Sequence, residues 1–190
     1  SGCGKTYSMN AVAAESGSKL FYIHMKQFLI EYINDSVDKM VKKIFEIARE
    51  NKPCILCIDP VELMGIRTND NWIQNAPYYG TESSLRRLKT EFLVQMQGFG
   101  KDNSSIQVIG LSKEPWNLDP SLRRRFCKRI YLRLPDKKCR KALFDKYLKE
   151  IEHDLSDEDY DTLLDHTNGF SYYEICCILQ IVLNHKKDES

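Results

Sequence analysis

The sequence has no apolar run that approaches the roughly 18–20 residues needed to span a bilayer, and no secretory or transit segment is visible in it. It has no internal repeat and no low-complexity tract. An excess of charge of one sign is also missing, because 28 basic residues are balanced by 27 acidic ones. This balance argues against a protein that binds nucleic acid through its overall charge, although a local basic strip remains compatible with it.

Metal-binding patterns are scarce as well. The four histidines show no ligand spacing. Of the seven cysteines, only Cys54 and Cys57 form a C-x-x-C pair, and they lie in an apolar run that predicts a buried strand. Alternation along a strand places these two thiols on opposite faces, which suits neither a redox pair nor a zinc corner. We therefore favour reduced, buried thiols in a cytosolic protein over a metal site.

Hydrophobic residues make up 42% of the 190 residues, which is enough for a folded core of one domain, or of one domain with a small appendage. Up to residue 135 the pattern alternates between helix and strand, and the clearest helix follows Ser36, where apolar residues recur at helical spacing. The nearly all-apolar run 54–58 is typical of a parallel sheet covered on both faces. The predicted strands are 20–25, 54–58, 106–109 and 129–134, the predicted helices are 6–15, 36–52 and 85–97, and 65–80 is predicted to be a long loop.

After residue 135 the sequence predicts helices alone, at 137–151, 157–166 and 171–185. The expected fold is therefore α/β, with a mostly parallel sheet flanked by helices at 1–135 and a small all-α subdomain at 136–190. Because the first residue is Ser1 rather than Met, we expect the sequence to be a fragment whose first strand lies upstream.

The first six residues, Ser1-Gly2-Cys3-Gly4-Lys5-Thr6, match the second half of a phosphate-binding P-loop, the Walker A motif. Glycines let backbone N–H groups point at phosphate oxygens, and the helix that follows adds its positive N-terminal end. In this motif the lysine reaches the β- and γ-phosphates and the threonine hydroxyl binds Mg²⁺. The first glycine of the pattern would precede Ser1, so a chance turn is the alternative. The predicted nucleotide-binding residues are Gly2, Cys3, Gly4, Lys5, Thr6 and Tyr7.

A second acidic element fits the same chemistry. Asp59 ends the apolar strand 54–58, where a P-loop protein needs an acid to hold a Mg²⁺-bound water. The plain alternative is an acid at a turn. The next residue is Pro60, which can neither accept a proton nor orient a water molecule.

Several longer runs occur in collinear order over nearly the whole chain: 48–53 (ARENKP), 86–96 (RRLKTEFLVQM), 115–119 (PWNLD), 121–126 (SLRRRF), 129–131 (RIY) and 134–136 (LPD). On these runs the sequence resembles the meiotic clade of AAA ATPases, most closely its vacuolar-protein-sorting branch, which disassembles endosomal-sorting (ESCRT) filaments. The resemblance implies a P-loop NTPase fold in which 136–190 form a lid. It also implies ATP and Mg²⁺ as cofactors and assembly into a homomeric or mixed hexamer.

The resemblance assigns further roles to matching residues. Arg124 and Arg125 match the arginine fingers, which stabilise phosphoryl-transfer charge in a neighbouring subunit. The alternative for this segment is a solvated basic patch or a nucleic-acid strip. Tyr32 and Ile33 match the pore-loop pair that grips extended polypeptide, with filling of the core as the alternative. The aromatic stretch 71–80 falls where a second pore loop is expected, and the sequence does not decide whether it contacts substrate.

Three positions depart from the family pattern. Pro60 replaces the glutamate that polarises the attacking water, Lys113 replaces the sensor asparagine, and Tyr172 replaces a glycine near the adenine. Tyr172 could crowd the base or stack on it. Glu62, two residues after Pro60, is the one candidate for a displaced base, and it would share the face of Pro60 if the strand continued.

Two functions therefore stay open. One is a hexameric ATPase that remodels or disassembles protein filaments in endosomal and vacuolar sorting. The other is a hydrolysis-deficient subunit that binds nucleotide and lends Arg124 and Arg125 to an active neighbour. In both cases we expect a cytoplasmic protein that reaches endosomal membranes only through partners and does not bind nucleic acid.

Overall fold

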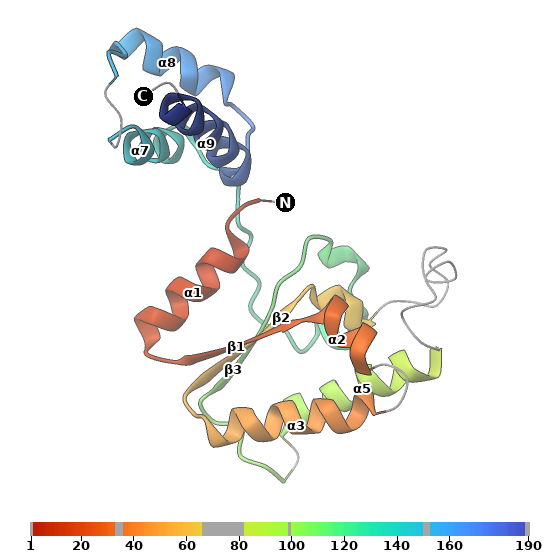
Figure 1. Cartoon of the computed structure of the whole chain (residues 1–190). Coiled ribbons are helices and arrows are strands. Elements are labelled where there is room, and N and C mark those ends of the chain that lie inside the picture. The colour runs from red at the N-terminus through yellow and green to blue at the C-terminus, as the bar shows by residue number, and fades with distance from the viewer. Residues whose placement is uncertain (1, 33–35, 66–81, 99, 150–152, 189–190) are drawn as a thin grey trace. The chain divides into compact units, whose positions relative to one another are not determined.

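The structure, a computed structural model, describes residues 2–32, 36–65, 82–98, 100–149 and 153–188 (Figure 1). It forms two compact units, one of Ser1–Thr6 with Ile130–Ser190 and the other of Tyr7–Arg129. Helix α1 (Lys5–Ser16) begins in the first unit and continues into the second. The predicted division between 1–135 and 136–190 stays a prediction.

The unit Tyr7–Arg129 is built on a parallel three-stranded sheet. Strands β1 (Lys19–His24), β2 (Cys54–Asp59) and β3 (Ile106–Gly110) lie in the order β1-β2-β3. The central strand β2 is buried at each of its first five residues, because its apolar side chains are covered on both faces. The predicted parallel sheet is confirmed, with Asp59 as the last residue of its middle strand.

Helices α3 (Val37–Glu50) and α5 (Glu82–Gln97) lie side by side against the sheet (Figure 1). In α3 the buried residues recur at helical spacing, and the ring of Phe45 meets that of Phe92 in α5 edge-on, with centroids 6.1 Å apart. These side chains and the apolar residues of β2 share one core. The helices predicted at 36–52 and 85–97 are confirmed.

Helix α2 (Met25–Tyr32) follows β1 directly and was not predicted from the sequence. Its spacing carries the signal, because Met25, Phe28, Leu29 and Tyr32 fall at i, i+3, i+4 and i+7 and pack into the core. After β2 the chain forms a short 3-10 helix, η1 (Val61–Gly65), so the strand does not continue to Glu62.

The strand predicted at 129–134 is wrong. The structure gives these residues no regular structure, and Ile130 and Tyr131 are 87% and 82% exposed. A strand is held by the N–H and C=O groups of a neighbour, and none of β1, β2 and β3 pairs with this segment. The apolar pattern alone therefore does not make it a strand.

The other unit contains α7 (Lys137–Leu148), α8 (Asp157–His166) and α9 (Tyr172–Asp188), which confirms the three predicted helices. Each begins at a side-chain cap: Asp136 for α7, Ser156 with Asp159 for α8, and Ser171 with Glu174 for α9. Their apolar faces enclose a small core of Phe144, Leu148, Leu164, Ile175 and Leu179. Among the described helices, none combines the length and apolar character that a membrane crossing requires.

Candidate functional site

The carboxyl ends of β2 and β3 are fastened to each other by backbone hydrogen bonds. Leu111 N–H donates to Ile58 O at 2.9 Å, and Val61 N–H donates to Leu111 O at 2.9 Å. Gly110 lies directly against Val61, and a Cβ at this glycine would come within 2.9 Å of the valine side chain. The residues that leave the two strands are therefore held side by side, at the edge of a parallel sheet where ligands usually bind.

Asp59 lies at this edge and is half-buried. In the parallel register His24 of β1 stands opposite Asp59, while Tyr22 stands opposite Cys57. The Tyr22 hydroxyl donates a hydrogen bond to Asp59 Oδ2. The sequence predicted Asp59 at a strand end, and the structure places it there, but Tyr22 was missed because the register of two strands is not visible in the sequence.

Glu62 and Lys113 meet at the same edge. The backbone N–H of Lys113 donates to Glu62 Oε1 at 3.1 Å. The other carboxylate oxygen, Oε2, is buried and has no hydrogen-bond partner among the described residues. The Lys113 residue is exposed, and no ion pair of its ammonium group occurs in the described part of the chain. The carboxylate of Glu62 is thus used to fix the loop after β3.

The P-loop residues begin helix α1. Gly2 and Gly4 have φ angles of 76° and 80°, in the left-handed region that glycine tolerates, and Lys5 starts the helix. The first turn of α1 carries no acidic residue, and Thr6 and Tyr7 are exposed, so the charge at this helix end favours an anion. The positive φ angles of the two glycines agree with a phosphate-binding turn, and the phosphate-binding role stays a prediction.

The P-loop also contacts the start of α9 within its own unit. Gly2 O accepts a hydrogen bond from Tyr173 N–H at 3.2 Å. A Cβ at Gly2 would lie 2.7 Å from Ser171 Oγ and 2.8 Å from Tyr173 Cβ, so no larger residue fits there without movement. The predicted lid helix and the predicted phosphate loop therefore share a tight backbone contact.

Tyr172 is the first residue of α9 and is half-buried. A hydrogen bond with the Cys139 thiol of α7, together with burial, raises the pKa of the Tyr172 hydroxyl above its ordinary value. This contact ties Tyr172 to α7 by its polar end. Whether the ring meets an adenine base stays a prediction.

Arg124 and Arg125 directly follow α6 (Pro120–Arg123), and both are exposed. Their backbone N–H groups donate to Pro120 O and Leu122 O at 3.2 and 2.9 Å. The α6 turn is anchored by Leu122, which is fully buried. The two exposed arginines thus lie on a hydrogen-bonded turn, and their finger role stays a prediction.

Asp119 caps this turn. Its Oδ1 accepts from Ser121 N–H at 2.8 Å, and its Oδ2 accepts from Lys89 Nζ at 3.1 Å. Partial burial alone would raise the pKa of Asp119, but the bonds from Ser121 and Lys89 lower it to about 2. The charged carboxylate therefore stabilises the segment that presents the two arginines.

Tyr32 ends α2 and is half-buried. Its ring centroid lies 5.4 Å from that of Phe28, and the side chain packs against the main core. Ile33, its predicted pore-loop partner, and the aromatic stretch 71–80 lie outside the described residues. The packing of Tyr32 agrees with the core-filling alternative, and the pore-loop role stays a prediction.

Cys54 and Cys57 are both buried in β2. Burial raises the pKa of both thiols, that of Cys57 to about 12. The Cys54 thiol donates to Ala48 O at 3.2 Å. In the described part of the chain no three His, Cys, Asp or Glu residues gather as a metal site would require. Burial thus disfavours the thiolate form of both cysteines.

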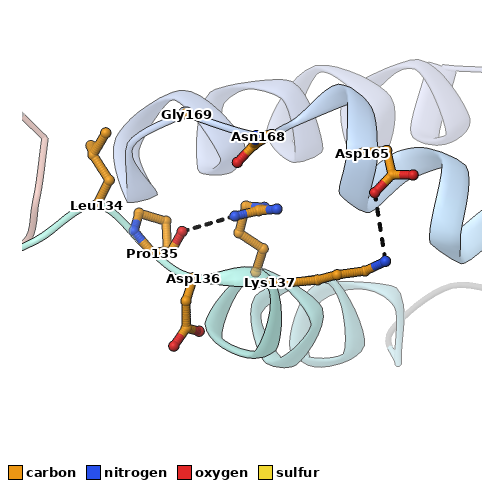
Figure 2. Close-up of a pocket in the computed structure, with 8 residues that line it drawn as sticks. Leu134, Pro135, Asp136, Lys137, Asp165, Asn168 and Gly169 are labelled. Carbon is orange, nitrogen blue, oxygen red and sulfur yellow. Dashed lines mark hydrogen bonds and ion pairs between the residues drawn. The ribbon is translucent and has the colours of Figure 1, made fainter.

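A pocket of about 570 Å³ lies in the helical unit between the start of α7 and the end of α8 (Figure 2). Figure 2 shows Lys137 reaching from α7 to Asp165 of α8, an ion pair of 3.5 Å. The buried Arg140 donates to Pro135 O at 2.9 Å and to Leu164 O at 3.0 Å. A cation at the carboxyl end of α8 is favoured by the helix dipole, so this arginine has a structural explanation.

Comparisons of the sequence give a consistent result. A sequence model described as "ATPase family associated with various cellular activities (AAA)" matches residues 1–134. The mouse vacuolar protein sorting-associated protein 4B is 39% identical over 184 residues, which cover 96% of this chain and 39% of the relative. The Dictyostelium discoideum vacuolar protein sorting-associated protein 4 is 38% identical over 174 residues, which cover 92% and 37%. The chain spans well under half the length of these relatives.

Solved structures with the same fold include the FIGL-1 AAA domain, with a TM-score of 0.74 and 27% identity over 92% of this chain and 54% of that one. A katanin structure, described in terms of its self-assembly, has a TM-score of 0.69 and 34% identity, and the match covers 94% of this chain and 53% of katanin. The fold is therefore shared over nearly the whole sequence.

Proposed function

Because the chain belongs to the AAA ATPase family, we propose that it binds ATP·Mg²⁺ through its P-loop as one subunit of a ring that remodels protein filaments. The binding step is supported by the left-handed conformations of Gly2 and Gly4, which suit a phosphate-binding turn, and by Lys5 at the start of α1. Within this proposal Lys5 pairs with the β- and γ-phosphates.

The residues available for the metal fit Mg²⁺. This ion prefers oxygen ligands and keeps several of its waters, and the chain offers the exposed Thr6 hydroxyl and the Asp59 carboxylate. Among the described residues only Tyr22 bonds to that carboxylate, through Oδ2, so Oδ1 is left for a metal-bound water. When bound, Mg²⁺ would neutralise phosphate charge.

The substrate class follows from the relatives. Those named for vacuolar protein sorting are 38–39% identical over more than nine-tenths of this chain. With the resemblance to filament-disassembling ATPases, this supports a protein filament of endosomal or vacuolar sorting as substrate, with Tyr32 and Ile33 as candidate pore-loop contacts. A cytoplasmic location follows from the same resemblance.

A second candidate, a subunit that binds ATP without hydrolysing it, is favoured by one observation. Pro60 stands where the family has its glutamate, and the carboxylate of Glu62, the candidate for a displaced base, accepts from the Lys113 backbone and has its other oxygen buried. A general base must lie within hydrogen-bond reach of its water, directly or through one other water, and the Lys113 bond at Oε1 together with the burial of Oε2 disfavours this for Glu62. Such a subunit would still present Arg124 and Arg125 to a neighbour.

One experiment separates these functions. Steady-state ATP turnover of the full-length protein is measured alone and mixed with an intact relative from the same organism. A filament-remodelling ATPase hydrolyses ATP alone. A hydrolysis-deficient subunit shows no ATP turnover alone. In the mixture it changes the turnover of the intact partner through Arg124 and Arg125.

A further inference from the structure

The hydrogen bond between Tyr22 and Asp59 joins two strands at the metal end of the proposed site. Tyr22 pairs with Cys57 in the register, so Asp59 is its diagonal neighbour, two residues farther along β2 on the same face. Diagonal neighbours in a sheet lie within reach of a long aromatic side chain. The hydroxyl can therefore reach the carboxylate without any distortion of the strands.

Tyr22 lies outside the main hydrophobic core. The side chain is 38% exposed, and it is absent from the residues that build or flank the main core, whereas its neighbour Phe21 packs there. The hydrogen bond to Asp59 is thus a fixed contact of its polar end. His24 stands opposite Asp59 in the register, yet no hydrogen bond joins the two in the described part of the chain.

From this geometry we propose that Tyr22 is a positioning residue for Mg²⁺ binding. Its hydroxyl holds Oδ2 of Asp59, which restrains the carboxylate and would leave Oδ1 to accept from a metal-bound water. Residues that bond to a metal-binding carboxylate typically contribute about ten- to a hundredfold to metal affinity. The inference rests on the proposed binding of ATP·Mg²⁺ and adds a residue to it that the family motifs do not include.

The test compares ATP dissociation constants of the full-length protein in EDTA and in excess Mg²⁺, because the ratio of the two isolates the contribution of the metal. Tyr22→Phe removes only the hydroxyl. We expect it to leave the constant in EDTA unchanged and to reduce the Mg²⁺ ratio by about tenfold or more. Tyr131→Phe, the same change at an exposed tyrosine, should leave both constants at the wild-type values.

A double variant sharpens the assignment. In an Asp59→Asn background the metal contribution is already reduced, so Tyr22→Phe should add little to it. The inference is wrong if Tyr22→Phe leaves the ratio of the two ATP dissociation constants unchanged or raises it. It is also wrong if Tyr22→Phe weakens ATP binding equally in EDTA and in Mg²⁺, because an equal loss indicates a structural role. If Lys5→Ala leaves ATP binding intact, the proposed function itself is wrong. If ATP binding depends on Lys5 but Tyr22→Phe leaves the ratio unchanged, only the inference about Tyr22 is wrong.

Discussion

The Lys113 N–H donates to Glu62 Oε1 at 3.1 Å, and this bond ties the loop after β3 to the 3-10 helix after β2. The pair connects two of the positions that decide whether the chain can hydrolyse ATP. Glu62 was the one candidate for a displaced base, and its carboxylate instead serves the backbone of the residue that replaces the sensor asparagine. The departures at Pro60 and Lys113 therefore lie at the same end of the sheet, and the candidate base between them is hydrogen-bonded to the Lys113 backbone.

Nucleotide binding should depend on Lys5. A hydrogen bond to a charged group is worth about 1.5–3 kcal/mol, so Lys5→Ala should weaken ATP binding roughly ten- to a hundredfold. Lys26→Ala, at an exposed lysine of α2, is the matched control and should bind as the wild type does. Titration with a fluorescent ATP analogue measures both. Equal affinities for wild type and Lys5→Ala would contradict the P-loop assignment.

Much of the scaffold around this site follows from sequence patterns. The apolar run that ends at Asp59 predicted a buried parallel strand, and the spacing after Ser36 predicted α3, because both patterns are local. The AAA resemblance of the motif runs is confirmed by the match over residues 1–134. The segment 129–134 failed because a strand also needs a pairing partner, which its own residues do not specify.

The contacts that matter most for function were beyond the sequence. Glu62 and Lys113 are 51 residues apart, and Tyr22 and Asp59 are 37 apart, so only the parallel register and the turn after β2 bring them together. The sequence also left open that Glu62 would share the face of Pro60 in a continuing strand. The 3-10 helix redirects it toward the β3 loop.

Asp119 should make stability depend on acid pH. Its folded-state pKa of about 2 lies below the usual value of about 3.9, so its contribution is complete above pH 4 and is lost as the pH falls toward 2. Asp119→Ala should lower the free energy of unfolding by about 1 kcal/mol at neutral pH, the usual worth of a cap. Urea unfolding across the acid range should show this difference narrowing below pH about 4.

The control for that series is Asp161→Ala. Asp161 makes a surface ion pair with Lys137 at 3.0 Å, with a side chain that is 70% exposed, so its removal should cost little at any pH. A difference between wild type and Asp119→Ala that stays constant with pH would show that the carboxylate charge is not what holds the turn.

Arg124 and Arg125 should act on a neighbouring subunit. We expect ATP-dependent association of the full-length protein, alone or with an intact relative, seen by native mass spectrometry. An arginine finger is typically worth about 10³–10⁵ in rate, so replacing both residues by Ala should strongly reduce the turnover of active sites that they serve. Arg133→Ala, at another exposed arginine, is the control. Monomers alone in the presence of ATP and the relative would contradict the ring.

Hydrolysis is the sharpest test. Loss of a positioned general base typically costs roughly 10²–10⁴ in rate, and Pro60 cannot substitute for it. We therefore expect turnover by the full-length protein alone at or near background. Lys113 can place a positive charge near the γ-phosphate and offset part of the loss, but it cannot accept a proton from water at the strand end. Pro60→Glu alone should give a partial gain in turnover, and Pro60→Glu with Lys113→Asn a larger one.

Glu62→Gln completes this series, because it removes the carboxylate charge while a side-chain oxygen stays available to the Lys113 N–H. With the carboxylate engaged as it is, the substitution should leave the background rate where it was and should not abolish the gain from Pro60→Glu. A wild-type rate of about 1 s⁻¹ or more is an ordinary enzyme turnover. Such a rate surviving in Glu62→Gln would refute a hydrolysis-deficient subunit, whereas its loss in Glu62→Gln would mean that the base has moved two residues along the chain, into η1.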